Sequence, residues 1–333
     1  MEKIRTAVIG AGKMGGIHSK VYSQLSDCEL VAIVDVDKEK AVKLAEKHGC
    51  EAYTDCGEIM DKVDAVTIAT PTEQHYSLAK QFIEKGIDVL IEKPLASTIE
   101  QGKEIVGLSR SYDVVVGVGH SERCNPVVRA MKRLDIEPKF IECNRISPYP
   151  FRSTDIGVVL DVMIHDIDII LSMAESPIRE VEAVGVNVIE EKEDICNARI
   201  TFENGCVANI TASRLALKTE RKVRVFSRQA YLSMDYFKKS GIVIKTDPNI
   251  NVVEWIREKK KSGDFDFMSV NWPDLLHIEE LEIDDKEPLR IEQESFLAAV
   301  RDPARRPEVS ASEGLAAMEC AEKILERISE HKW

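Results

Sequence analysis

Short apolar runs alternate with stretches of helical periodicity along the first 120 residues of the chain. The apolar runs are rich in β-branched residues and about as long as buried strands, and they cover residues 4–9, 30–34, 65–69, 88–91 and 114–118. The stretches between them have the spacing of amphipathic helices, near residues 14–26, 38–48, 73–85 and 98–111. Strands that alternate with helices are typical of βαβ units, so this part predicts an α/β fold with a doubly wound parallel sheet.

The pattern changes beyond residue 120, where strand-like segments follow one another with few helices between them. We expect strands near residues 139–146, 179–189, 195–202, 206–213, 222–227, 230–235 and 241–245. Helical segments are expected near residues 155–174, 290–301 and 311–330, whereas residues 246–289 predict no element. The sequence therefore predicts two domains, residues 1–120 and residues 121–333, the second an α+β domain with a mostly antiparallel, open-faced sheet.

A glycine pattern of the form G-x-G-x-x-G directly follows the first apolar run, at Gly10, Gly12 and Gly15. A dinucleotide site needs the first glycine in a tight turn, the second where the backbone approaches a pyrophosphate, and the third where the next helix packs closely on the strand. The pyrophosphate would then lie at the N-terminus of that helix. The cofactor-binding residues expected in this loop are Gly10, Gly12, Lys13, Met14 and Gly15.

Asp35 lies just after the second apolar run, twenty residues after Gly15. This is the expected place for a carboxylate that accepts hydrogen bonds from the adenosine ribose hydroxyls. A carboxylate there repels a 2′-phosphate, so we expect NAD as the cofactor, with NADP as the alternative because Lys38 and Lys40 lie close by. A second alternative is that Asp35 only caps the helix that follows it.

The composition excludes several classes of protein. Hydrophobic residues make up 44% of the chain and charged residues 31%, which is enough apolar material for folded cores. No apolar stretch approaches the roughly 18 residues that span a bilayer, and the absence of a signal segment favours a cytoplasmic protein. A net charge of −13 argues against nucleic acid as a partner. The eight cysteines form no C-x-x-C pair, so no metal is expected.

Three ionisable residues lie at helical spacing in the segment near residues 155–174. Asp161, His165 and Asp168 are four and three positions apart, which places them on one face of a helix that is otherwise largely apolar. Such a stripe presents a carboxylate and an imidazole to one cavity. Two alternatives stay open at this point: a metal site that lacks further ligands at recognisable spacing, and a buried His–Asp pair with a structural role.

Glu92, Lys93 and Pro94 follow the fourth apolar run. This position is the C-terminal end of a buried strand, the edge at which α/β sheets bind their ligands. A lysine there can hydrogen-bond a substrate hydroxyl and stabilise the negative charge that builds on its oxygen as hydride leaves the carbon. The alternative is an exposed charge at the end of a strand.

Five motifs of the chain occur in the order and at the spacing of the Gfo/Idh/MocA oxidoreductase family. They are the glycine loop at residues 10–15, Asp35, Thr70-Pro71 with His75, Glu92-Lys93-Pro94, and Asp161 with His165. The segments Glu294-Ser295-Phe296 and Glu313-Gly314-Leu315 also resemble this family, so the resemblance spans the whole chain. Met163 is a departure, because many members have a glycine two residues after the aspartate. This change can reshape the pocket without removing the catalytic pair.

The resemblance implies a Rossmann domain followed by a domain whose open sheet mediates dimers or tetramers. It implies an NAD(P)-dependent dehydrogenase that acts on CH–OH groups. In such an enzyme His165 is the general base that takes the hydroxyl proton, Lys93 polarises the reacting oxygen, and Asp161 orients the site. The resemblance also extends the expected cofactor-binding residues to Thr70, Pro71, His75, Glu92 and Lys93.

Residues 119–126 resemble a G-H-x-E-R-F-N-P element of family members that act on nucleotide sugars, with Cys124 in place of the phenylalanine. Arg145 and Arg152 lie just before the expected catalytic helix, and arginine forks suit a diphosphate. We therefore expect oxidation of the 3-hydroxyl of UDP-N-acetylglucosamine or a similar nucleotide sugar. The substrate-binding residues expected are Arg123, Asn125, Arg145, Arg152, Asp161 and His165. Ordinary ion pairs of Arg145 and Arg152 are the alternative.

Two other functions stay open at this point. One is an inositol or free-sugar dehydrogenase of the same family, and the other is a catalytically silent NAD-binding sensor or scaffold. The presence of Lys93, Asp161 and His165 together argues against the sensor, which has no need of the whole set. The partners expected are a sugar or nucleotide-sugar substrate and further copies of the chain in a homodimer or homotetramer, with neither nucleic acid nor a membrane.

Overall fold

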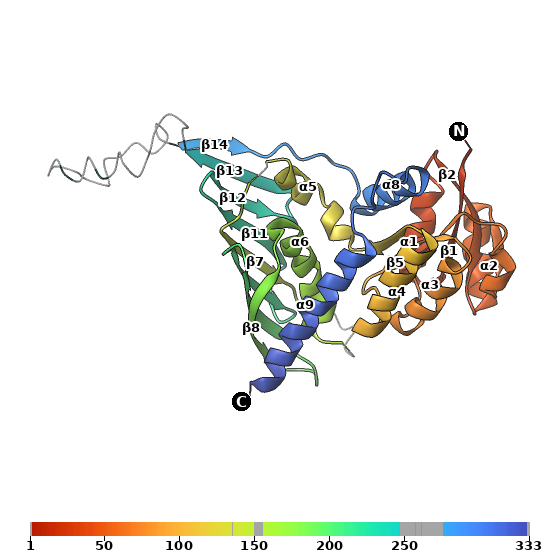
Figure 1. Ribbon diagram of the computed structural model, residues 1–333, viewed down its shortest axis with the longest axis horizontal. Helices are drawn as coiled ribbons and strands as arrows, with labels where there is room; N and C mark the ends of the chain where they lie inside the picture. Colours follow the sequence, from red (N-terminus) through yellow and green to blue (C-terminus); the bar gives the residue numbers. More distant parts are fainter. Residues whose placement is uncertain are drawn as a thin grey trace. The chain divides into compact units, whose positions relative to one another are not determined.

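The computed structural model describes residues 2–134, 136–149, 156–246, 257, 261 and 276–331 (Figure 1). The chain divides into two compact units. Met1–Asn125 and Lys286–Glu322 form the first unit, and Pro126–Asp285 and Lys323–Trp333 form the second. The sequence analysis placed residues 286–322 in the second domain, and the structure corrects this assignment. Helix α8 (Pro288–Arg301) packs against α1 (Lys13–Tyr22) and buries Phe296 in a core of the first unit.

The first unit contains a six-stranded sheet in the order β3-β2-β1-β4-β5-β6, and all its neighbouring strands run parallel. The strands are β1 (Ile4–Ile9), β2 (Cys28–Val34), β3 (Glu51–Tyr53), β4 (Ala65–Ile68), β5 (Asp88–Glu92) and β6 (Val116–Gly119). The predicted doubly wound parallel sheet is confirmed, and only the three-residue β3 was not predicted. The strand order reverses between β1 and β4, the place where such sheets bind ligands outside the carboxyl ends of their strands.

Two apolar cores flank this sheet because successive side chains of a strand point to opposite faces. Ile9 and Ile68 belong to one core, and Val8 and Ile33 belong to the other. The remaining helices of this unit are α2 (Lys38–His48), α3 (His75–Ile83), α4 (Ile99–Tyr112) and the short η1 (Cys56–Ile59), η2 (Thr72–Gln74) and η3 (Ser121–Cys124). The strands β4, β5 and β6 are buried on both faces, which explains why the sequence shows near-continuous apolar runs there.

The second unit contains an eight-stranded sheet in the order β14-β13-β12-β11-β7-β10-β9-β8. Its strands are β7 (Phe140–Ile146), β8 (Ile178–Val186), β9 (Ile195–Phe202), β10 (Val207–Ser213), β11 (Glu220–Phe226), β12 (Ala230–Asp235), β13 (Ser240–Thr246) and β14 (Leu276–Glu280). Every neighbouring pair is antiparallel except β7 with β10. The mostly antiparallel sheet is therefore confirmed, and β14 adds a strand within a segment for which no element was predicted.

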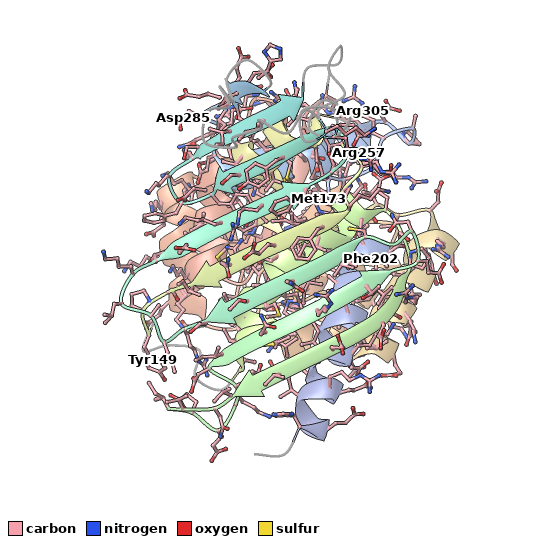
Figure 2. All side chains as sticks on the ribbon, turned by 90° about the vertical axis from the view of Figure 1, so that its left-hand side faces the viewer. Tyr149, Met173, Phe202, Arg257, Asp285 and Arg305 are labelled. Atoms are coloured by element: carbon pink, nitrogen blue, oxygen red, sulfur yellow. The ribbon has the colours of Figure 1, made fainter. Side chains whose placement is uncertain are left out.

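Helices cover one face of this sheet. The unit contains α5 (Pro126–Lys132), α6 (Ile164–Ala174) and the end of α9 (Ala311–Glu330). The helix predicted near residues 155–174 is instead a π-helical turn over Val159–Met163 followed by α6. Figure 2 looks onto the other face, which no described helix of this unit covers. Within the described part of the chain, no helix is both long and apolar enough to cross a membrane.

Candidate active site

The glycine loop joins β1 to α1. Gly10 has a φ of +103°, and a Cβ atom there would lie 2.6 Å from the carbonyl oxygen of Ala69. A Cβ atom on Gly15 would lie 1.7 Å from the carbonyl oxygen of Gly10, so the helix can pack this closely only with glycine. A Cβ atom added to Gly12 would have no other atom within 4 Å. Gly12 is the N-cap of α1, and no side chain caps the helix there. The N-terminus of α1 thus offers N–H groups without intrahelical acceptors, which fits the pyrophosphate of a dinucleotide.

Asp35 lies beside the glycine loop, one residue after β2. Its Oδ2 accepts a hydrogen bond from the N–H of Ala11 at 2.6 Å, and its Oδ1 accepts one from the N–H of Asp37 at 2.8 Å. A carboxylate has about four lone-pair sites, so two are left for ribose hydroxyls. The cap of α2 is a different residue, Asp37, whose side chain accepts from the N–H groups of Glu39 and Lys40. Asp35 is therefore not the cap that the alternative interpretation required.

His75 ties together the two loops that follow β4 and β5. The imidazole is buried, with Nδ1 2.9 Å from the carbonyl oxygen of Pro94 and Nε2 3.0 Å from the carbonyl oxygen of Thr70. Carbonyl oxygens only accept hydrogen bonds, so the ring satisfies both contacts when both of its nitrogens carry hydrogen. The contacts join Thr70 and Pro94, which flank the carboxyl edge of the sheet.

Glu92 and Lys93 lie at the carboxyl end of β5, as the sequence predicts. Glu92 is buried, and Lys93 is half-buried. The N–H of Lys93 donates to Oε2 of Glu92 at 3.2 Å. Burial alone would raise the pKa of Glu92, but the hydrogen bond and charge of His18, followed by the N–H and charge of Lys93, hold this pKa below its usual value. An ionised carboxylate thus accepts a hydrogen bond from the backbone of the proposed catalytic lysine.

Arg123 and Asn125 are both buried in the first unit. Nη1 of Arg123 lies 2.7 Å from Oε1 of Glu313, whose other carboxylate oxygen accepts from the N–H and hydroxyl of Ser310. Burial opposes the ionisation of Glu313, but the charge of Arg123 and the hydrogen bonds from Ser310 hold its pKa below the usual value. The charge of Arg123 is therefore already balanced by a carboxylate that sequence reasoning did not identify as its partner.

Arg145 lies within β7 in the second unit and is buried. Its Nε and Nη2 donate to the two carboxylate oxygens of Asp166, both at 2.9 Å, in the parallel geometry that suits a guanidinium. Alternation along β7 places Arg145 on the same face as Ile141 and Cys143, which are also buried. This alternation is the sequence signal that predicts an inward-pointing arginine. Arg152, the second arginine expected to bind substrate, lies outside the described residues.

Asp161 lies in the π-helical turn and His165 in the first turn of α6. The N–H of Ile164 donates to the carbonyl oxygen of Val159, a bond that spans five residues instead of four. Asp161 therefore departs from the α-helical phase on which the predicted stripe depends. Asp161 and His165 are half-buried, whereas Asp168 is buried. Single π-helical turns occur often at functional sites.

The predicted site residues are distributed over both units. The first unit holds the cofactor-binding residues together with Lys93, Arg123 and Asn125, and the second holds Asp161, His165 and Arg145. Sequence reasoning missed His18, Glu313 and Asp166, which contact predicted site residues, and Gln293, which contacts His18. Among the described residues, no group of three or more His, Cys, Asp or Glu side chains could hold a metal ion.

Comparisons with known proteins cover both units. The model described as "Oxidoreductase family, NAD-binding Rossmann fold" matches residues 4–120, and the GFO/IDH/MocA C-terminal domain matches residues 141–233. UDP-N-acetylglucosamine 3-dehydrogenase of Acidithiobacillus ferrooxidans is 33% identical over 241 residues, or 72% of this chain and 76% of that protein. A solved structure of that enzyme covers 99% of each chain, with a TM-score of 0.86 and 28% identity.

A second group of relatives acts on cyclitols by name. Inositol 2-dehydrogenase of Rubrobacter xylanophilus is 31% identical over 196 residues, which are 56% of each protein. The matched regions include the glycine loop and Asp35 in the first unit and the π-helical turn with His165 in the second. The chain belongs to the Gfo/Idh/MocA family of NAD-binding oxidoreductases, and it is a dehydrogenase that acts on CH–OH groups.

Proposed function

We propose that this dehydrogenase oxidises a nucleotide sugar at a ring hydroxyl, most specifically the 3-hydroxyl of UDP-N-acetylglucosamine. The observation that carries this proposal is the similarity to the Acidithiobacillus ferrooxidans enzyme, which extends over 99% of both chains with a TM-score of 0.86. The sequence resemblance at residues 119–126 supports it independently. The proposal fixes the substrate, whereas family membership fixes only the type of reaction.

The proposed roles assign one step to each of three side chains. His165 takes the proton of the substrate hydroxyl, since an imidazole can accept and return a proton near neutral pH. Lys93 donates a hydrogen bond to the same oxygen and stabilises its negative charge as the C–O bond becomes a carbonyl. Asp161 orients the substrate. NAD, held by the glycine loop and Asp35, supplies the hydride acceptor when bound.

The two buried arginine pairs favour a second candidate, an inositol or free-sugar dehydrogenase. Arg123 and Arg145 each face a carboxylate, so neither presents an unbalanced charge to a diphosphate. An uncharged polyol needs no such charge, and inositol dehydrogenases are among the relatives.

Parallel assays of substrate oxidation test these proposals. Purified protein with NAD is mixed with UDP-N-acetylglucosamine, inositol or glucose. NADH formation is followed by the absorbance of the reduced nicotinamide at about 340 nm. A second set includes 2-oxoglutarate, which detects a cofactor that stays bound between turnovers. Turnover of the nucleotide sugar alone supports the proposal, and turnover of a free polyol alone replaces the substrate. No turnover while NAD is bound favours the sensor function. His165→Asn provides the control and is expected to abolish turnover.

We further propose that the open face of the eight-stranded sheet binds a second copy of the chain. Phe140, Phe226 and Tyr231 from three neighbouring strands form an aromatic cluster, with ring centroids 5.9 Å and 4.8 Å apart. Figure 2 shows this face without a covering helix. Aromatic side chains on an uncovered sheet face suit a protein–protein interface, where such residues are enriched. Phe226→Glu is expected to lower the mass measured by light scattering, whereas Phe237→Glu, an exposed site beyond β12, is expected to leave it unchanged.

A further inference from the structure

A buried polar cluster lies behind Lys93 in the first unit. It consists of His18 from α1, Glu92 from β5 and Gln293 from α8, and we call it the His18 cluster. His18 and Gln293 are completely buried, and Glu92 is buried with 9% exposure. Nε2 of His18 lies 2.8 Å from Oε1 of Glu92, and Nε2 of Gln293 lies 2.9 Å from Nδ1 of His18. Buried polar groups are costly unless they are hydrogen-bonded, so a cluster built from three distant segments needs a reason.

The contacts of Gln293 fix the hydrogen positions on His18. The amide nitrogen of Gln293 lies 3.2 Å from the backbone carbonyl oxygen of His18, which can only accept a hydrogen bond. The nitrogen end of the amide therefore faces His18, and its second hydrogen points at Nδ1. Nδ1 must then carry a lone pair, so the hydrogen of the neutral ring is on Nε2. His18 consequently donates from Nε2 to Oε1 of Glu92 and holds this oxygen in place.

The carboxylate of Glu92 contacts both His18 and the backbone of Lys93. Oε1 is held by His18, and Oε2 accepts from the N–H of Lys93 at 3.2 Å. Gly119 on β6 makes room for this arrangement, because a Cβ atom there would lie 3.1 Å from Oε2 of Glu92. The carboxylate is thus fixed on both oxygens beside the backbone from which the Lys93 side chain extends.

We propose that His18 is a positioning residue for Lys93, acting through Glu92. By holding Oε1, His18 keeps the Glu92 carboxylate aimed at the N–H of Lys93, so that the lysine side chain extends from a fixed backbone toward the reacting oxygen. The inference rests on the role proposed for Lys93 in the dehydrogenase reaction. Without the donor on His18, the buried carboxylate turns away, and the N–H of Lys93 loses its fixed acceptor.

A matched pair of substitutions separates this role from simple packing. His18→Gln keeps a donor nitrogen within reach of Glu92, whereas His18→Met has a similar length and no donor. We expect His18→Met to lower kcat by about 100-fold, the cost of a roughly 1 Å misplacement of a catalytic group. The KM for substrate and the Kd for NADH stay close to wild type, and His18→Gln restores most of the activity. His48→Met on α2 is the control and leaves kcat unchanged.

A double-mutant cycle tests whether His18 acts through Lys93. If it does, His18→Met causes no further loss of kcat in a Lys93→Met background, because the group it positions is already gone. A full additional loss in that background overturns the proposal. Equal loss in His18→Gln and His18→Met also overturns it, since only packing would then matter. The rates refer to folded protein, which is counted by titration with NADH.

A measurement without substrate keeps this proposal distinct from the proposed function. Acetic anhydride acylates neutral amines, and peptide mass spectrometry reads the rate of acylation at Lys93. The rate is expected to rise in His18→Met and not in His18→Gln, because a half-buried lysine that is no longer held in one place meets the reagent more often. If no sugar is oxidised but this difference is found, the substrate proposal fails and the role of His18 stands. If Lys93 reacts equally in both variants, the role of His18 is refuted.

Discussion

Asp88 at the amino end of β5 provides a test of the electrostatics of the first unit. Its Oδ1 accepts a hydrogen bond from the N–H of Val115 at 2.8 Å. Burial, to which the nearby carboxylates of Asp64 and Asp113 add, raises the pKa of Asp88 to about 6 despite this hydrogen bond. The ordinary pKa of an aspartate is about 3.9. The folded protein therefore holds Asp88 in an environment that disfavours its charge.

The sign and size of the effect follow from this difference. Because the folded pKa exceeds the unfolded pKa, protonation favours the fold, and this contribution is lost as the pH rises through about 6. A difference of about 2 pKa units corresponds to at most about 3 kcal/mol. Asp88 is half-buried, so solvent reduces the cost, and we expect Asp88→Asn to stabilise the protein by about 1–2 kcal/mol near pH 8. The asparagine oxygen can still accept from Val115.

Urea unfolding near pH 8 and near pH 5 measures this prediction. The free energy of unfolding should rise in Asp88→Asn near pH 8, and the gain should fall to about half near pH 5, because folded Asp88 is then protonated whereas the unfolded aspartate, with a pKa of about 3.9, is still ionised. Asp61→Asn is the control, because Asp61 is exposed and is not among the carboxylates that raise the pKa of Asp88. Destabilisation near pH 8, or a gain that is the same at both pH values, would refute the reasoning.

Three further predictions concern the site. Arg145→Leu should lower the free energy of unfolding by about 3–5 kcal/mol, because it leaves Asp166 buried and unpaired. The double variant Arg145→Leu with Asp166→Leu should recover part of this loss in the same urea titration. Gly15→Ala should abolish NADH binding measured by fluorescence titration, because its Cβ atom would meet the Gly10 carbonyl oxygen; unchanged affinity would contradict the loop geometry. Asp35→Ser should raise the affinity for NADP relative to NAD in parallel titrations, and an unchanged ratio would exclude Asp35 from cofactor choice.

The Rossmann half of the fold could be predicted because its signals are local. The strands of the parallel sheet are buried on both faces and read as apolar runs, and Gly10 and Gly15 mark a turn that no other residue can make. The two closing helices were also predicted, but not the unit to which they belong. Helical periodicity shows that Phe296 lies on an apolar face, whereas it contains no information about which sheet that face covers.

The contacts of the site were harder to predict than its residues. Lys93 and Asp35 lie at strand ends that the pattern identifies. His18 gives no such signal, because its partners Glu92 and Gln293 lie 74 and 275 residues away. The π-helical turn at Asp161 was missed because the segment has the apolar spacing of an ordinary α-helix. Arg145 could have been assigned to the inner face by strand alternation, but the sequence does not identify Asp166 as its partner.

Residues 286–322 belong to the first unit, although they follow most of the second unit in the chain. This arrangement determines the order in which the two units can be completed during synthesis. The ribosome releases the first unit's six strands early, but Phe296 and Gln293 follow only after the whole eight-stranded sheet of the second unit has been made. Domains generally fold as units when their chain is complete. The nucleotide-binding half of this enzyme therefore begins first but cannot be completed until most of the second unit has been made, and a nascent chain that stops before residue 286 lacks the glutamine that holds His18 in place.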